Sequence, residues 1–287
     1  MVFMLNSVRE NEYRNYYRTD SAGRTAANRM FSNTPSYPAA PDTDKTVLSG
    51  LLLALVSLTL NKVSGWCGNK LMAGKEFTSA ENSKKIAGEM AKNNKLNVIT
   101  DYIDHANKGK YGAELAQTLE PVANGQNAFF MDKALRNASG EIKGLAVAPK
   151  SKPSLMLHEL GHAINASKGG LLKFMQKTRG FVSYIPTALL LLNGVKNDPD
   201  KSNFIERNAG KLGFLAFLPT ILEEGLASIR GVNAAKAAEK AGQLAGGVKL
   251  DVLKRNYFFA WMTYLLSGIG LGIAARQAFL EKKHKNS

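Results

Sequence analysis

Residues 256–275 contain no charged side chain at any of twenty consecutive positions, and an arginine stands on each side, at Arg255 and Arg276. As an α-helix this run is about 30 Å long, which matches the hydrocarbon thickness of a lipid bilayer. Four of its first six residues are aromatic, as is common at the membrane–water interface. The run therefore predicts a transmembrane helix over 256–275, followed by a basic tail over 276–287.

Shorter uncharged runs predict further apolar helices. A run of sixteen residues predicts a membrane helix over 46–64, preceded by a polar, disordered arm over 1–45. Two runs of sixteen and eleven residues predict an apolar helical hairpin over 180–222. Each run of the hairpin is short for a full span, so it either enters the bilayer partway or packs as a buried helix. These runs predict a mostly helical, multi-pass membrane protein.

The formal net charge of +15 does not by itself predict a nucleic-acid partner. The basic residues are scattered over residues 65–180 and the loops, without a stripe of interleaved aromatics or a nucleic-acid motif. Attraction to anionic lipid head groups explains the charge more directly, so we expect a bilayer and no nucleic acid as a partner. Cys67 is the single cysteine, which excludes an intramolecular disulfide.

A candidate metal-binding motif is His158-Glu159-Leu160-Gly161-His162. Residues four apart lie on one face of a helix, so both imidazoles can reach one metal ion about 2.0–2.1 Å away. Glu159 then lies beside the metal and can take a proton from a water whose pKa the metal lowers to roughly 7. This spacing predicts a zinc site and hydrolysis of a peptide bond, with Glu159 as the general base.

The residues around this motif distinguish a metal site from a chance match. A chance match would lie on a solvated helix face. Here the flanking residues are apolar on most sides, so the histidines and the glutamate are expected to be buried polar groups that need partners. Ser151 and Pro153 predict the N-cap and the first turn of this helix.

A catalytic zinc ion normally has three protein ligands, so a third must come from elsewhere in the chain. His105 and His284 lie in polar stretches and are expected at the surface. Glu223 and Glu224 instead follow an apolar run, where a charge without a partner would be costly. One of these two carboxylates is therefore the expected ligand, although glutamates at a helix end beside a membrane would give the same pattern.

H-E-L-G-H followed some sixty residues later by E-x-x-A resembles the gluzincin metallopeptidases. The likeness is closest to the membrane-embedded group that includes the HtpX-type quality-control protease, the mitochondrial Oma-type protease and the CAAX prenyl endopeptidase. The resemblance implies that Glu224 is the third ligand and that Ala227 is the small residue of the motif. Ser228 stands where the group has an aspartate that supports a zinc histidine, so Ser228 is the candidate to contact a ligand from behind.

A second likeness to the same group precedes the motif. Asn127-Ala128-Phe129-Phe130 resembles its N-A-F strand, and residues 142–147 are expected to form the strand that leads into the zinc helix. The group's Pro-Gly-Gly after N-A-F is absent. The resemblance implies that Asn127, Ala128, Phe129 and Phe130 form an edge strand beside the zinc, to which an extended substrate adds as another strand.

Together these features predict a mostly α protein with a small α+β zincin catalytic domain. Its soluble part covers residues 65–179, and the third-ligand helix and an amphipathic segment cover 223–255. We expect one zinc per chain and a protein or peptide substrate at or near the membrane. The expected location is a bacterial inner (plasma) membrane, in which the protein is integral and multi-pass. The alternative is a membrane-anchored zinc pseudoprotease or scaffold with weak or no activity, which Ser228 favours.

Overall fold

The computed structural model describes residues 4–5, 59–60, 62–71, 73–136, 140–178, 188 and 204–285; residues 4–5, 136 and 277–285 are described by their backbone only. The protein is mostly helical with a small sheet, in agreement with the predicted fold class. Its chain divides into two compact units. Unit 1 holds the sheet, the helices packed on it, and residues 222–261. Unit 2 includes residues 204–221 and 262–285 among those described.

The sheet consists of three main strands and one two-residue strand at its edge. In the order of the sheet the strands are β1 (Met4–Leu5), β3 (Phe129–Arg136), β4 (Ile142–Pro149) and β2 (Val98–Ile103). β3 and β4, at the two predicted strands, form an antiparallel hairpin, whereas β2 runs parallel to β4. The last six residues of β4 are buried, as expected for the central strand of a covered sheet.

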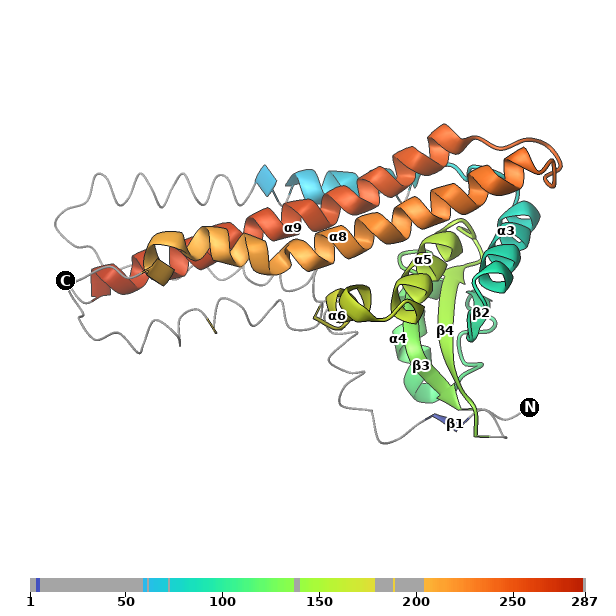
Figure 1. Ribbon diagram of the computed structural model, residues 1–287, viewed down its shortest axis with the longest axis horizontal. Coiled ribbons are helices and arrows are strands. Elements are labelled where there is room, and N and C mark those ends of the chain that lie inside the picture. Colours follow the sequence, from blue (N-terminus) through green and yellow to red (C-terminus); the bar gives the residue numbers. More distant parts are fainter. Residues whose placement is uncertain are drawn as a thin grey trace. The chain divides into compact units, whose positions relative to one another are not determined.

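Helix α5 (Leu155–Ser167) packs on β3 and β4 and against α3 (Ala80–Asn93), as Figure 1 shows. Eleven consecutive residues of α5, from Met156 to Ala166, are buried. The helix therefore lies within the main apolar core of the protein. Two further helices complete this part of the fold, α4 (Ala113–Ala123) and α6 (Gly170–Thr178).

Two long helices follow, α8 (Phe204–Lys240) and α9 (Leu250–Lys285). Both are long and apolar enough to cross a membrane, α8 over its full length and α9 over Leu250–Arg276. In the most apolar 18-residue stretch of each helix, only 39% is buried in α8 and 33% in α9, whereas the core helix of a soluble protein would be mostly buried. Within unit 2 the two helices approach closely at glycines, where Gly272 would bring an added Cβ within 2.7 Å of the Gly210 carbonyl oxygen.

Some predicted segments lie outside the described residues. They include most of the arm over 1–45, of which only Met4–Leu5 are described, and residues 46–58 of the first predicted membrane helix. They also include residues 180–203 of the predicted hairpin, except residue 188. Thr59, Leu60 and Lys62–Leu71 are helical.

Two predicted boundaries have no counterpart in the structure. α8 continues without a break through residue 222, and α9 already begins at Leu250 instead of residue 256. α8 also includes the charged residues Glu206 and Arg207, which precede the second uncharged run of the predicted hairpin. Polar residues do not end a helix whose apolar face remains packed, and this explains the difference. Helix α5, which carries the two histidines, begins at Leu155 after Ser154, later than Ser151 and Pro153 predict.

Candidate metal centre

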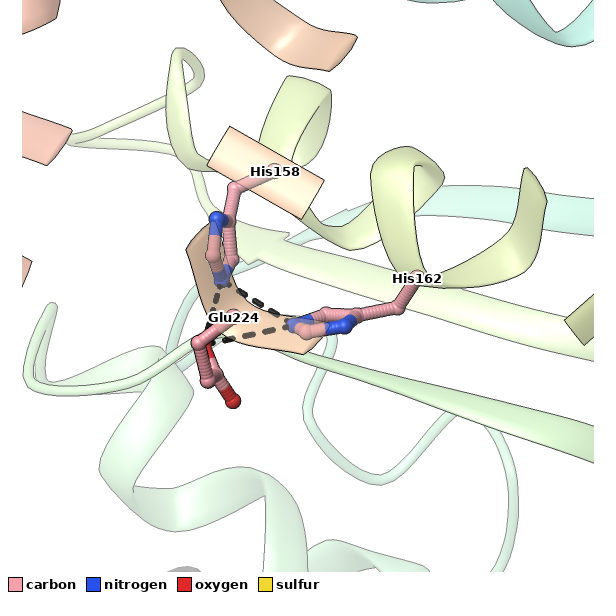
Figure 2. Close-up of side chains that lie close together, drawn as sticks. All are labelled: His158, His162 and Glu224. Atoms are coloured by element: carbon pink, nitrogen blue, oxygen red, sulfur yellow. Dashed lines mark hydrogen bonds and ion pairs between the residues drawn. The ribbon is translucent and has the colours of Figure 1, made fainter. Parts of the chain in front are cut away.

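Three buried side chains in unit 1 meet at one point, as Figure 2 shows: His158 and His162 from α5 and Glu224 from α8. The Nε2 atoms of the two histidines lie 3.0 Å apart. Oε2 of Glu224 lies 3.1 Å from Nε2 of His158 and 3.6 Å from Nε2 of His162. The structure therefore brings together the three residues that were predicted as ligands, in a group that can hold a metal ion.

The spacing of these three atoms fits a tetrahedral ion. Ligands about 2.0–2.1 Å from a tetrahedral zinc lie about 3.3–3.4 Å from one another. The measured separations of 3.0, 3.1 and 3.6 Å fall on both sides of that value. Two imidazole nitrogens and one carboxylate oxygen are also a common ligand set of catalytic zinc, so both the chemistry and the spacing fit this metal.

Small residues allow α5 and α8 to approach closely enough to form the cluster. A Cβ added at Gly161 would lie 2.4 Å from the carbonyl oxygen of Ala227, and one added at Gly231 would lie 3.1 Å from that of Leu157. Ala227 is itself fully buried. The glycine of H-E-L-G-H and the alanine of E-x-x-A therefore pack on one another, and this contact brings Glu224 to the histidines.

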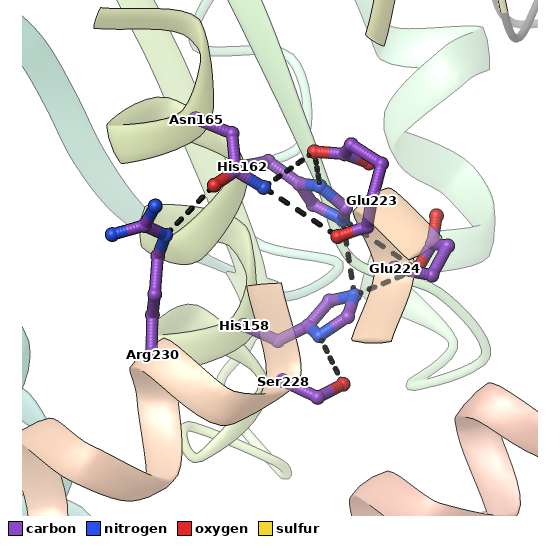
Figure 3. Close-up of polar contacts among 7 residues, drawn as sticks. All are labelled: His158, His162, Asn165, Glu223, Glu224, Ser228 and Arg230. Atoms are coloured by element: carbon purple, nitrogen blue, oxygen red, sulfur yellow. Dashed lines mark hydrogen bonds and ion pairs between the residues drawn. The ribbon is translucent and has the colours of Figure 1, made fainter. Parts of the chain in front are cut away.

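A second set of polar residues contacts the far side of each imidazole ring, as Figure 3 shows. Ser228 Oγ lies 3.1 Å from Nδ1 of His158, the place predicted for it. Glu223 Oε1 lies 2.8 Å from Nδ1 of His162. If each Nδ1 carries the proton and donates it to these oxygens, each Nε2 presents a lone pair to the metal. The contacts thus favour the ring tautomers that a metal requires.

Glu223 is also the first member of a chain of hydrogen bonds. Asn165 Nδ2 donates to Glu223 Oε1 over 2.9 Å, and Arg230 Nε donates to Asn165 Oδ1 over 2.7 Å (Figure 3). Asn165 and Glu223 are both fully buried. This chain fixes the Glu223 carboxylate and places the Arg230 cation two hydrogen bonds away from it.

The buried carboxylates determine the electrostatics of the site. Burial alone would lower the pKa of His162, but the negative charges of Glu223 and Glu224 outweigh it and raise the pKa above its usual value. Glu159, which is 5% exposed, adds a third buried carboxylate. A divalent cation together with Arg230 would balance three negative charges, and this balance favours a metal ion over an empty cluster.

Tyr257 of α9 closes one side of the site. Its ring centroid lies 5.6 Å from that of His158, and its hydroxyl donates to the Ser154 carbonyl over 2.8 Å at the start of α5. α5 is thus held by β3 and β4, by α8 and by α9.

The remaining predicted residues are not members of the ligand cluster. Asn127 and Ala128 precede β3, and Phe129 and Phe130 begin it, opposite Val147 and Ala146 of β4. His105 is 64% exposed, as expected of a surface histidine. The His284 side chain lies outside the described residues.

Sequence reasoning missed three supporting residues: Glu223 as the partner of His162, and Asn165 and Arg230 behind it. A signal for two of them was present. Asn165 follows His158 by seven residues, and Arg230 follows Glu223 by seven, which places each pair on one helix face. Comparisons with protein-family models, with curated proteins and with solved structures find no match to this chain. The inference of function therefore rests on the site itself.

Proposed function

We propose that the protein is a zinc-dependent endopeptidase that hydrolyses peptide bonds of membrane or membrane-proximal proteins. The observation that carries the proposal is the buried His158–His162–Glu224 cluster, whose three ligand atoms are spaced as a tetrahedral ion requires. The H-E-x-x-H spacing adds a buried carboxylate, Glu159, directly beside the first ligand. One zinc per chain is the expected occupancy.

Each residue of the site has a distinct task in this proposal. His158, His162 and Glu224 would hold the ion, which would supply Lewis acidity and lower the pKa of a water molecule to roughly 7. Glu159 is placed to act as the general base, which would accept a proton from the attacking water and deliver it to the leaving amine. Glu223 and Ser228 keep the imidazole rings oriented by accepting hydrogen bonds from their Nδ1 atoms.

The hairpin of β3 and β4 supports a mode of substrate binding. α5 packs on both strands, so β3 runs beside the helix that carries the two histidines. An extended peptide that aligns with Asn127, Ala128, Phe129 and Phe130 would present its backbone to the metal without a requirement for a particular side chain. This mode suits an enzyme that cleaves proteins at exposed, extended segments.

The long helices support a location in a membrane, for which we propose an integral, multi-pass arrangement in a bacterial inner membrane. α8 and α9 are long and apolar enough to cross a bilayer, and most of each apolar window is not buried. Exposed apolar side chains of this kind have a favourable environment in lipid and an unfavourable one in water. Because Glu224 lies on α8, the same helix would link the metal centre to the bilayer.

A zinc-binding scaffold without protease activity is the second candidate, and Ser228 favours it. A neutral hydroxyl contacts His158 where the resembled proteases have a carboxylate, and a carboxylate raises the basicity of a metal-bound imidazole more strongly. The two candidates share the zinc site and differ only in turnover.

The test combines metal analysis with peptidase assays on the detergent-purified full chain. We expect one zinc per chain, cleavage of an unfolded protein substrate, and loss of cleavage by roughly 10²–10⁴-fold in Glu159→Gln with the zinc retained. Glu239→Gln, at an exposed position of α8, is the matched control and should cleave normally. Bound zinc without cleavage would select the scaffold, and a protein that binds no zinc would refute both candidates.

A further inference from the structure

Helix α6 (Gly170–Thr178) follows the zinc helix and presents apolar side chains to its surroundings. Leu171 is 70% exposed and Phe174 is 59% exposed, and their spacing of three places them on one side of the helix. Met175 and Gln176 are buried and attach the helix to the fold. The exposed pair thus belongs to a helix that packs on the protein through an adjoining face.

The other exposed large apolar side chains in the described part of the chain are unevenly distributed. Apart from the pair on α6, they lie on the helical stretch 59–71 or on the two candidate membrane spans. None lies on α3, α4, α5 or the main strands. α6 therefore shares this property with the helices that are apolar enough to cross a bilayer, and not with the soluble elements around it.

The charges around the exposed pair are of one sign. Lys168, Lys173 and Lys177 flank or interleave with Leu171 and Phe174. From residue 161 to residue 197 the sequence has five basic side chains and no aspartate or glutamate, although the whole chain has 23 acidic residues. Directly after this helix the sequence continues into the uncharged run 180–195. Apolar side chains beside lysines, without acidic residues, are the pattern of a helix at an anionic membrane surface.

We infer that α6 lies in the head-group region of a bilayer that contains anionic lipids, with Leu171 and Phe174 inserted at the boundary of the acyl chains. The lysines contact the lipid phosphates. Because α5 ends at Ser167, only two residues separate the zinc helix from this contact. The contact holds the C-terminal end of α5 next to the membrane surface, and so favours substrates at that surface.

The inference rests on the membrane location proposed above and is independent of the zinc chemistry, so its test needs no protease activity. A nitroxide is attached at Phe174→Cys in a Cys67→Ala background of the full chain, and the protein is reconstituted into vesicles of phosphatidylcholine with phosphatidylglycerol. Leu171→Cys provides a second position on the same face. Glu114→Cys, at an exposed position of α4, is the matched control. Faster spin relaxation of the nitroxide in the presence of oxygen indicates a label in lipid. Faster relaxation in the presence of a water-soluble nickel chelate indicates a label in water.

We expect the nitroxides at positions 171 and 174 to be accessible to oxygen and protected from nickel, and the one at 114 to be accessible to nickel. Each lysine near an anionic surface raises the equilibrium ratio of docked to undocked α6 by a factor of about five. Replacing Lys168, Lys173 and Lys177 together by glutamine should therefore lower this ratio on the order of 100-fold. Vesicles of phosphatidylcholine alone should lower the same ratio by a similar factor.

Two results would overturn the inference. Access to nickel equal to that at position 114 would place α6 in water, and protection from both reagents would mean that protein covers it. Release of the unlabelled chain from vesicles by carbonate would instead refute the membrane location itself. The two failures are therefore distinguishable.

Discussion

Replacing Gly161 by alanine should separate the two helices that form the metal centre. The added Cβ would lie 2.4 Å from the carbonyl oxygen and 2.7 Å from the Cα of Ala227, and both of these atoms belong to the backbone. No side-chain rotation can relieve such a contact. α5 and α8 must therefore move apart until the Cβ reaches an ordinary contact distance of 3.4 Å or more, a shift of about 1 Å.

The size of this shift sets the expected effects. Overpacking of this kind costs about 1–3 kcal/mol of the free energy of unfolding. Metal–ligand distances tolerate deviations of only about 0.2 Å, so a 1 Å displacement of Glu224 from the histidines should weaken zinc binding by about 100-fold or more. A 100-fold weaker zinc site removes up to about 2.7 kcal/mol of ligand-linked stability in excess zinc. The variant should thus lose more stability with zinc than without it.

Chemical denaturation with and without zinc, together with chelator competition for the zinc dissociation constant, measures both effects. Gly88→Ala is the matched control, because Gly88 lies within α3 with no atom near the added Cβ. That change should raise stability by about 0.5–1 kcal/mol, through the loss of glycine's conformational freedom, and leave zinc affinity unchanged. If Gly161→Ala matches the wild type in zinc affinity, the close contact of α5 with α8 does not position the ligands.

Three further sets of substitutions test the proposed ligands, their support and the membrane helices. Glu224→Ala should abolish stoichiometric zinc binding, whereas Glu223→Gln should still bind zinc, with a dissociation constant raised roughly 10–100-fold. Chelator competition measures both constants, and the reverse order would exchange the roles of the two glutamates. Ser228→Ala should weaken zinc binding about tenfold, and Ser228→Asp should strengthen it, because a carboxylate accepts the His158 hydrogen bond more strongly than a hydroxyl does. Equal zinc affinities in the wild type and both variants would contradict this expectation. Ile269→Arg places a charge on the exposed face of α9 and should cost about 2.5–3.5 kcal/mol of membrane insertion, measured as the carbonate-resistant fraction. In a water-soluble protein the same change would alter stability by no more than about 0.5 kcal/mol.

Much of the fold around the site follows from local patterns in the sequence. The spacing of His158 and His162 within apolar neighbours predicts α5, and the structure has this helix buried between sheet and helices. The stretches at 127–130 and 142–147 predict two strands, and the structure has β3 and β4 there as antiparallel neighbours. The uncharged run over 256–275 lies within α9. In each of these cases a few neighbouring residues determine the outcome.

The extent of the long helices does not follow from such patterns. Charged residues near position 206 and Pro219 divide the sequence of α8 into apparently separate segments, yet the helix is continuous from Phe204 to Lys240. Close contacts with α9, such as Gly268 with Phe217 and Ile221 in unit 2, favour the continuous helix. The length of this helix depends on packing between elements that are distant in sequence, and the helix propensities of neighbouring residues do not predict that packing.

The adjacent carboxylates Glu223 and Glu224 show the same limit at the scale of the site. The sequence indicates that one of them binds the metal, and the resemblance selects Glu224. Successive residues on a helix point about 100° apart, so the two carboxylates reach different atoms: Glu224 the Nε2 side of both rings, and Glu223 the Nδ1 of His162. The sequence does not show that the second carboxylate is fully buried, or that Asn165 and Arg230 stabilise it there. Both carboxylates are thus accommodated at the end of an apolar run, Glu224 in the group that can hold a metal ion and Glu223 as the hydrogen-bond partner of His162.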